Sequence, residues 1–113
     1  MSGAHRISLQ AAWDAVAGGA SWVRSFGRPT GVAVADRIWL VIERPAACTV
    51  LLNGRHLPPI GGGLGAWRHD VTAALRPRNE LRLEFAGRTA IEPGRAALPE
   101  SLGSVALEIE PAR

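Results

Sequence analysis

The sequence predicts an all-β protein, a single antiparallel β-sandwich of the jelly-roll type with about seven or eight strands. Three observations support this prediction. Apolar residues recur with a period of two in Glu80–Phe85 and Ser104–Glu110, which is typical of strands with one solvated side. The pair Asn53-Gly54, flanked by apolar residues, indicates a tight hairpin. The eight prolines and thirteen glycines are spread along the chain, as expected for many short strands joined by turns.

Length and composition place the chain among globular proteins of one domain. A chain of 113 residues has room for one hydrophobic core, so we expect a single domain over residues 1–113, with residues 1–5 as a flexible N-terminus. No run approaches the roughly 20 apolar residues that span a bilayer, and a membrane partner is not expected. The first ten residues lack the apolar core of a secretory signal, and the single Cys48 excludes an internal disulfide. A cytoplasmic location is the resulting expectation.

The charge pattern argues against nucleic acid as a partner. The thirteen basic residues are all arginine, and no lysine or tyrosine is present, so a sequence pI near 10.9 accompanies a formal net charge of only +3. The arginines are scattered among acidic residues and form no basic block. Few aromatic residues stand beside them to stack on bases.

The first third of the chain is compatible with two interpretations. Ile7 and Leu9 alternate as in a strand, and Trp22–Phe26 marks another strand. Residues 8–16 either continue as strand or form a short helix that begins at Ser8 and ends at a glycine pair. Because the rest of the chain is β, strands are the favoured interpretation.

The middle of the chain contains the interior strands and the hairpin. Arg37–Glu43 is apolar on both sides, with one face formed by Ile38, Leu40 and Ile42 and the other by Trp39 and Val41. A strand of this kind is usually central or covered by another segment. Thr49–Leu52 continues into the Asn53-Gly54 turn, and Arg55–Leu57 is the short returning strand, which two prolines end.

Two connections stand out by length or composition. Ile60–Ala66 holds four glycines in seven residues and predicts a mobile loop, without the Gly-Lys-Ser/Thr ending of a phosphate-binding loop. Ala86–Gly103 predicts a long loop of eighteen residues. Loops of this length are uncommon unless they act as lids, binding loops or disordered segments.

The order of these elements resembles the galactose-binding-domain-like jelly roll. More narrowly, it is similar to the N-terminal sugar-binding domain of glycoside hydrolase family 2, the β-galactosidase and β-glucuronidase type. The resemblance covers residues 22–85 well and rests on Trp22, Arg24, Phe26, Pro29, Val50, Leu52, Asn53, Gly54, Trp67, Asp70, Val71, Thr72, Leu75, Asn79, Leu81 and Leu83.

The resemblance implies a fold and, by ancestry, carbohydrate binding. It departs from the family at Arg78, where members usually carry a glycine before the asparagine. The catalytic barrel of those hydrolases, with both catalytic carboxylates, has no counterpart in this sequence. Since one fold hosts many functions, the resemblance by itself does not assign a ligand.

Neither catalysis nor a metal centre is predicted from the residues. The acidic residues fall mostly at strand ends or on solvated faces, and nothing pairs two of them as a retaining glycosidase requires. Cys48 shares a face with Val50 and Leu52, which favours a packed core thiol over a nucleophile. The three histidines lack zinc-binding spacing, so no metal or cofactor is expected. Family jelly rolls often hold a structural calcium; Asp36 and Asp70 could contribute oxygens, although two acids do not make a cage. The favoured role of Asp70 is instead to accept a hydrogen bond from the backbone near Thr72 and close a turn or cap one helical turn.

The tryptophans are the better candidates for a ligand site. A sugar ring stacks on an aromatic side chain while neighbouring polar groups bind its hydroxyls. Trp22 and Trp39 lie within strands and are expected in the core, whereas Trp13 and Trp67 lie near strand ends or loops. Trp67 is the favoured one, although packing at the end of the sandwich would explain it as well. The predicted ligand-binding residues are Arg55, His56, Trp67, Arg68 and His69.

Two functional hypotheses follow. The first is a non-catalytic carbohydrate-binding-like module that binds a glycan through loops at one end of the sandwich. The alternative is a protein-protein interaction or structural module, a homodimer or accessory subunit, on the same fold. Trp39 and Val41, apolar on what could be an outward face, favour the alternative.

Overall fold

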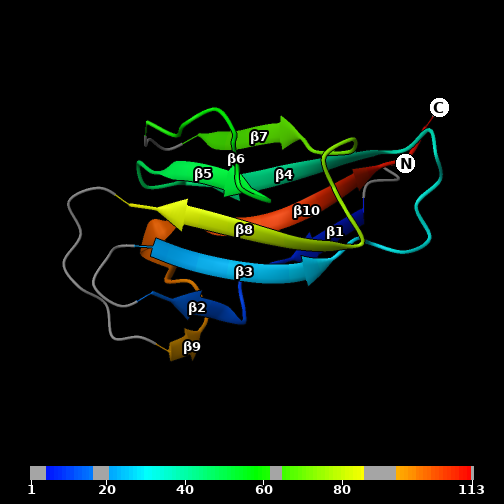
Figure 1. Cartoon of the computed structure of the whole chain (residues 1–113). Helices are drawn as coiled ribbons and strands as arrows, with labels where there is room; N and C mark the ends of the chain where they lie inside the picture. The colour runs from blue at the N-terminus through cyan, green and yellow to red at the C-terminus, as the bar shows by residue number, and fades with distance from the viewer. Residues whose placement is uncertain (1–4, 17–20, 62–64, 86–93, 113) are drawn as a thin grey trace.

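The computed structural model describes residues 5–16, 21–61, 65–85 and 94–112, and within them it confirms the antiparallel β-sandwich (Figure 1). The predictions for residues 1–4, for the glycines at 62 and 63 and for residues 86–93 lie outside the described residues. Two sheets, of four and six strands, pack face to face. Among the described segments, no helix is long and apolar enough to cross a membrane.

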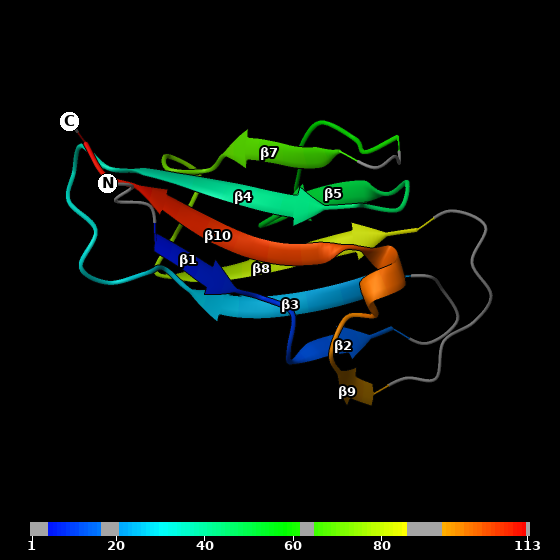
Figure 2. The same cartoon turned by 180° about the vertical axis from the view of Figure 1, so that it is seen from behind.

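The four-stranded sheet has the order β1-β10-β4-β7 and lies toward the viewer in Figure 2. These strands are β1 (His5–Ser8), β10 (Ser104–Glu110), β4 (Arg37–Glu43) and β7 (Ala66–Asp70). The central pair places Leu107 opposite Leu40, and both side chains are almost fully buried. The strands β1 and β7 are therefore the two edges of this sheet.

The six-stranded sheet has the order β6-β5-β8-β3-β2-β9. It is formed by β6 (Arg55–His56), β5 (Thr49–Leu52), β8 (Arg78–Glu84), β3 (Ser21–Gly27), β2 (Trp13–Ala15) and β9 (Gly94–Ala96). The alternation predicted for Glu80–Phe85 is confirmed, because Leu81 and Leu83 are fully buried while Glu80 is exposed. This strand lies between β5 and β3 and forms the centre of the sheet.

Residues 8–16 contain the end of β1 at Ser8 and the strand β2, joined by an irregular segment, and no helix. Ala12 adopts a left-handed φ of 63°, which separates β1 from β2. The Gln10 side chain then secures the corner: it donates to the carbonyls of Leu98 and Gly103 at 2.8 and 2.9 Å and accepts from the Val105 amide at 2.8 Å. Instead of hydrogen bonds within a helix, this segment forms hydrogen bonds to backbone groups about 90 residues away in the chain. The sequence pattern of residues 8–16 alone cannot reveal such bonds.

The structure differs from the expectation for Trp13. Its position near a strand end suggested possible exposure, but the side chain is 0% exposed. The reason is that β2 is an interior strand of the six-stranded sheet, between β3 and β9, and the Trp13 side chain packs into the hydrophobic core. The indole Nε1 donates to the Leu9 carbonyl, so the buried polar group is satisfied.

Ten strands are described, compared with seven or eight predicted, and the additional ones are short or irregular. The segment predicted as one long loop contains β9 and a 3₁₀ turn, η1 (Glu100–Leu102). Leu98 and Leu102 from this segment are buried in the core, which ties it to the sandwich. The strand β7 was not predicted either, because its residues Ala66–Asp70 lack apolar alternation.

One buried amide connects three parts of the fold. Asn79 is 4% exposed, and its Oδ1 accepts from the Arg76 amide at 2.8 Å and from Asn53 Nδ2 at 3.0 Å. Its Nδ2 donates to the Arg76 carbonyl at 2.8 Å and to the Phe26 carbonyl at 3.5 Å. The side chain of Asn53 in turn accepts from the Glu80 amide at 2.9 Å. The start of β8, the end of β3 and the hairpin turn are thus held together by one side chain.

Replacing this amide should destabilise the fold strongly. Asn79→Ala leaves the Arg76 amide and the Asn53 side chain without their acceptor, and we expect a loss of about 3 kcal/mol in the free energy of unfolding. Urea denaturation followed by tryptophan fluorescence measures it. The control is Glu80→Ala, an exposed neighbour, which should change stability by no more than about 0.5 kcal/mol. Equal effects of the two substitutions would contradict the role assigned to Asn79.

Candidate functional site

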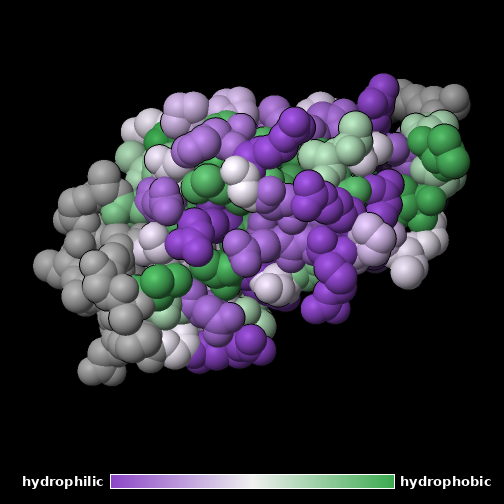
Figure 3. All heavy atoms as spheres, in the orientation of Figure 1, coloured by the Kyte–Doolittle hydropathy of each residue, from purple (hydrophilic) through white to green (hydrophobic). Residues whose placement is uncertain are grey.

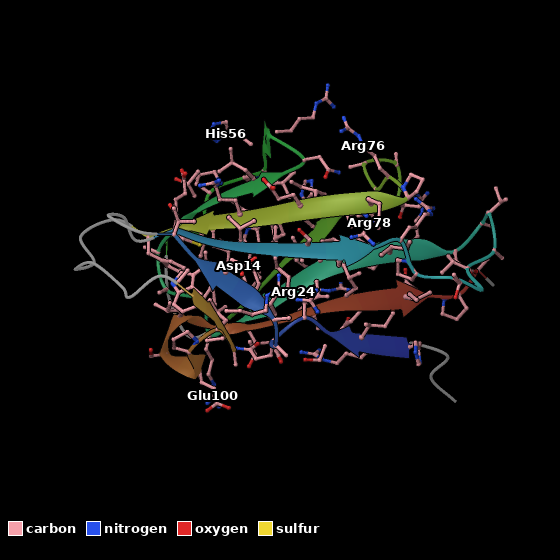
Figure 4. The ribbon with its side chains drawn as sticks, turned by 60° about the horizontal axis from the view of Figure 1, so that its bottom comes forward. Asp14, Arg24, His56, Arg76, Arg78 and Glu100 are labelled. Atoms are coloured by element: carbon pink, nitrogen blue, oxygen red, sulfur yellow. The ribbon has the colours of Figure 1, made fainter. Side chains whose placement is uncertain are left out.

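A groove of about 810 Å³ lies where the edges of the two sheets meet, between the β6 hairpin and β7. Its third wall is the turn after β7. The residues that line it are Leu52, Asn53, Arg55, His56, Leu57, His69, Ala73, Ala74, Leu75 and Arg76. In Figure 4, His56 and Arg76 are labelled on the same side of the molecule, beyond β8.

The hairpin forms one wall because its turn is very short. Asn53 and Gly54 have φ values of 53° and 81°, the left-handed conformations that a two-residue turn of this type requires. Leu52 is therefore paired with Arg55, and Leu51 with His56. The sheet ends at β6, so the side chains of Arg55 and His56 are exposed at its edge.

The strand β7 forms the opposite wall, and its successive side chains point alternately to the inner and outer face of the sheet. Trp67 pairs with Ile42 and His69 with Leu40, so both lie on the inner side of the sheet. The two rings stack with centroids 5.9 Å apart and planes inclined by 20°. Trp67 is partly buried against the core, and His69 lines the groove. The indole therefore supports the imidazole and does not itself line the groove.

Arg68, the remaining predicted site residue, lies on the other side of β7. It pairs with Val41 on the outer face, and its guanidinium carbon is 4.3 Å from the centroid of the Trp39 ring. The Glu108 carboxylate forms ion pairs with the guanidinium groups of Arg68, at 3.6 Å, and Arg6, at 2.7 Å. The structure thus brings three of the five predicted residues, Arg55, His56 and His69, to the groove, places Trp67 behind His69 and separates Arg68 from them.

Charged side chains also cover the outer face of β4, whose apolar residues were the basis of the interaction hypothesis. Trp39 and Val41 lie on the outer side of β4, as the interaction hypothesis supposed, so the expectation that Trp39 belongs to the core is wrong. Val41 is nevertheless only 3% exposed. Arg6 bridges Glu43 and Glu108, each at 2.7 Å, across the strands on which these residues lie. This network leaves no large apolar patch on the described part of that face.

Sequence reasoning missed Arg76 and the neighbouring turn. Arg76 could have been found by assuming that the hairpin strand β5 pairs with the predicted strand that begins near Asn79. Since β5 and β8 are neighbours, the segment just before β8 must return past the hairpin. The amide of Asn53 donates to the Glu80 carbonyl at 2.9 Å and fixes that approach. Arg76 consequently lines the same groove as Arg55.

The groove is rich in cationic and hydrogen-bonding groups. Two arginines and two histidines line it, together with the Asn53 amide, and none of its described lining residues is acidic. The remaining lining is aliphatic, from three leucines and two alanines. Such a surface suits a ligand that carries hydroxyl or acidic groups on a partly apolar body.

Asp70 positions the turn that forms the third wall. Its Oδ1 accepts from the Thr72 hydroxyl at 2.6 Å and from the Thr72 amide at 2.9 Å. These two bonds, in that order, and the nearby charge of Arg37 hold the pKa of the Asp70 carboxyl below its ordinary value of 3.8. The Thr72 hydroxyl also accepts from the Ile38 amide at 2.8 Å, which fastens the turn to β4. The predicted turn role of Asp70 is confirmed.

The described residues offer no further reactive centre. No group of three His, Cys, Asp or Glu side chains among them could hold a metal ion. Asp36 accepts from the amides of Ala33 and Ala112 and closes a loop. Cys48 is buried, and burial raises the pKa of its thiol to about 11, which is the environment of a packed core thiol.

Comparison with solved structures identifies the fold. The chain is similar to an FMN-binding β-glucuronidase from Faecalibacterium prausnitzii, with a TM-score of 0.68 and 18% identity over 98% of this chain. It is also similar to a Bifidobacterium dentium β-glucuronidase complexed with coumarin-3-O-glucuronide, with a TM-score of 0.70 and 18% identity over 96% of this chain. A putative β-galactosidase from Bacteroides fragilis matches with a TM-score of 0.63 and 14% identity over 96% of this chain.

These matches cover one part of much larger proteins. The chain spans 23%, 30% and 23% of the three enzymes, respectively. Its fold is therefore that of one domain of β-glucuronidases and β-galactosidases, as the resemblance implied. No family model and no curated protein sequence matches the chain.

The turn at Asp70 predicts a pH dependence of stability. A carboxyl whose pKa is lowered on folding contributes stability at neutral pH, and this contribution is lost as the pH falls below 3.8 through the folded pKa. Asp70→Asn should therefore cost about 1 kcal/mol at pH 7, since the site is partly exposed, and progressively less below pH 3.8.

Carbon-detected NMR titration of the Asp70 carboxyl gives the direct measurement. Thr72→Val removes the hydroxyl donor and should raise the pKa of Asp70 toward its ordinary value. An unchanged pKa in Thr72→Val, or a cost of Asp70→Asn that does not vary with pH, would show that the turn does not depend on this carboxylate.

Proposed function

We propose that this chain is a non-catalytic carbohydrate-binding module whose site is the groove between the β6 hairpin and β7. The observation that carries the proposal is the convergence of Arg55, His56, His69 and Arg76 on one groove. The groove belongs to a fold that also occurs as a domain in glycosidases. The groove volume of about 810 Å³ is sufficient for one or two sugar rings.

The ligand chemistry follows from the lining. The imidazole of His69, which stacks on Trp67, gives an aromatic surface at the β7 wall, against which the apolar face of a pyranose can pack. The guanidinium groups of Arg55 and Arg76 come from the hairpin and from the turn after β7, and they are donors for hydroxyls or a carboxylate. Because no acidic residue stands among the described lining residues, an acidic saccharide is favoured over a neutral one.

A binding role, without hydrolysis, is consistent with this chemistry. Retaining glycosidases place two carboxyl groups about 5 Å apart, and inverting ones place them somewhat farther apart. The described lining of the groove contains neither an aspartate nor a glutamate. We therefore assign to this chain recognition of a saccharide and no bond cleavage.

A glycan array of neutral and acidic saccharides, followed by calorimetry on the strongest hit, tests the proposal. Arg55→Ala and His69→Ala should each weaken binding about tenfold, equivalent to ~1.4 kcal/mol, by removing one charged or stacked contact. Arg68→Ala is the matched control: it neighbours His69 in the chain but lies on the opposite side of β7, so affinity should stay within about twofold.

Two outcomes would overturn the proposal. One is an array without binding to any neutral or acidic saccharide. The other is a hit whose affinity falls as much in Arg68→Ala as in His69→Ala. Circular dichroism and thermal unfolding of each variant exclude a trivial loss of fold.

We propose, as a second candidate, that the fold serves as a protein-interaction module, either as a homodimer or as an accessory subunit. The observation in its favour is the loop between β3 and β4, where Val34 is fully exposed within the apolar run of residues 31–35. Figure 3 shows hydrophobic residues at that end of the molecule, beside the mainly hydrophilic outer face of the six-stranded sheet. Asp36 holds this loop by accepting from the Ala33 amide at 2.9 Å.

Light scattering of the purified chain over a range of concentrations tests the homodimer. We expect Val34→Asp to convert a dimer to monomer without changing thermal stability, since Val34 makes no buried contacts. A monomer at every concentration, or a dimer that survives Val34→Asp, would contradict a homodimer through this loop.

A further inference from the structure

A second hollow, of about 530 Å³, lies on the opposite side of the sandwich from the groove. It opens between the edge strand β1, the C-terminal half of β3 and β10. The residues that line it are His5, Ile7, Ser8, Leu9, Arg24, Phe26, Gly27, Arg28, Pro29, Thr30, Leu107 and Ile109. No aspartate or glutamate is among these described residues.

Arg24 faces into the interior of the sandwich. The residues on either side of it on the inner face of β3 are Trp22 and Phe26, both buried, and its strand partner is the fully buried Leu81. An arginine at a core-facing position of a strand is unusual; Arg24 as a whole is half-buried, and its Nε is the buried part. In Figure 4 its side chain lies between the ribbons of β3 and β10.

The guanidinium of Arg24 is not satisfied by the described residues. Its Nε is buried and has no hydrogen-bond partner, and Nη1 donates only to the carbonyl of Ser25. No described carboxylate lies within 4 Å of it, in contrast to Arg6, Arg37, Arg68, Arg82 and Arg95. A buried donor without an acceptor costs free energy, which an incoming acceptor would recover.

The other arginine that lines the hollow, Arg28, is already hydrogen-bonded to backbone carbonyls. Nη1 of Arg28 donates to the Leu75 carbonyl at 3.2 Å and to the Thr72 carbonyl at 3.4 Å. Arg28 therefore secures the turn after β7 and contributes only part of its surface to the hollow. Arg24 differs from Arg28 because its buried Nε has no hydrogen-bond partner among the described residues, and His5 also lines the hollow.

Part of the wall around Arg24 is apolar, beside the polar side chains of His5, Ser8 and Thr30. Ile7 and Ile109 are partly buried and pack on the core, and Leu9, Phe26 and Leu107 are buried. A guanidinium beside this apolar part of the wall suits a carboxylate on a short hydrocarbon or aromatic body. The carboxylate accepts from the guanidinium in a charge-assisted pair while the body replaces water against the aliphatic walls.

We propose that the hollow between β1 and β3 is a second binding site, for a small monocarboxylic acid with an apolar body, and that Arg24 binds its carboxylate. This site is separate from the proposed saccharide groove, which lies at the β6 and β7 edges. The concave shape and modest volume favour a small molecule over an acidic segment of another protein.

NMR of the native chain titrated with hexanoate and benzoate tests the proposal. The Nε–Hε resonance of Arg24 and the methyl groups of Ile7, Leu107 and Ile109 should shift saturably. Hexanamide and benzamide, which keep the shape but lack the charge, should bind at least tenfold more weakly. This comparison uses the native protein and stays valid if substitution of Arg24 impairs folding.

Substitution of Arg24 provides a second test. Arg24→Gln should weaken hexanoate binding at least tenfold, whereas Arg82→Gln should leave it unchanged, because Arg82 lies on the outer face of the same sheet. Equal affinity for acid and amide, or equal shifts at exposed arginines, would overturn the proposal. Preferential binding of an acetylated Leu-Glu peptide over hexanoate would also overturn it, in favour of a protein partner.

Discussion

The buried amide of Asn79 is the interaction on which the groove side of this molecule depends. It binds the Arg76 backbone through both its oxygen and its nitrogen, and it also contacts Asn53 and the Phe26 carbonyl. An asparagine can do this because its amide carries two donors and an acceptor with two lone pairs. A leucine at this position would fill the space but leave these backbone groups unpaired. The polar bonds, more than the volume, explain why this residue is buried.

The same side chain sets the shape of the candidate site. By holding the hairpin at Asn53 and the turn at Arg76 against the start of β8, it places two walls of the groove at a fixed distance. Asp70 and Thr72 attach the other end of that turn to β4 through the Ile38 amide. The groove is therefore bounded by backbone that is hydrogen-bonded at both ends. The side chains of the candidate site project from these supports, which is the arrangement expected of a preformed binding site.

The sequence predicted the parts of the fold that local chemistry determines. The Asn53-Gly54 hairpin, the alternating strands and the Asp70 turn are each specified by residues close in the chain, and each is confirmed. The short strands and the burial of Trp13 depend on which strands become neighbours, and this information is spread over distant segments. The same limit applies to the site. Two adjacent residues, Arg68 and His69, look equivalent in the sequence, but the pleat of an edge strand sends them to opposite faces.

We propose above that the groove between β6 and β7 is the carbohydrate-binding site of this chain. The most direct measurement is a ¹⁵N and ¹³C NMR titration of the native chain with a soluble acidic oligosaccharide. The account predicts that saturable shifts concentrate on the side chains of His56, His69 and Arg76 and on the indole of Trp67. Shifts that appear instead on Trp39 and the outer face of β4, or the absence of saturable shifts with both acidic and neutral oligosaccharides, would contradict it.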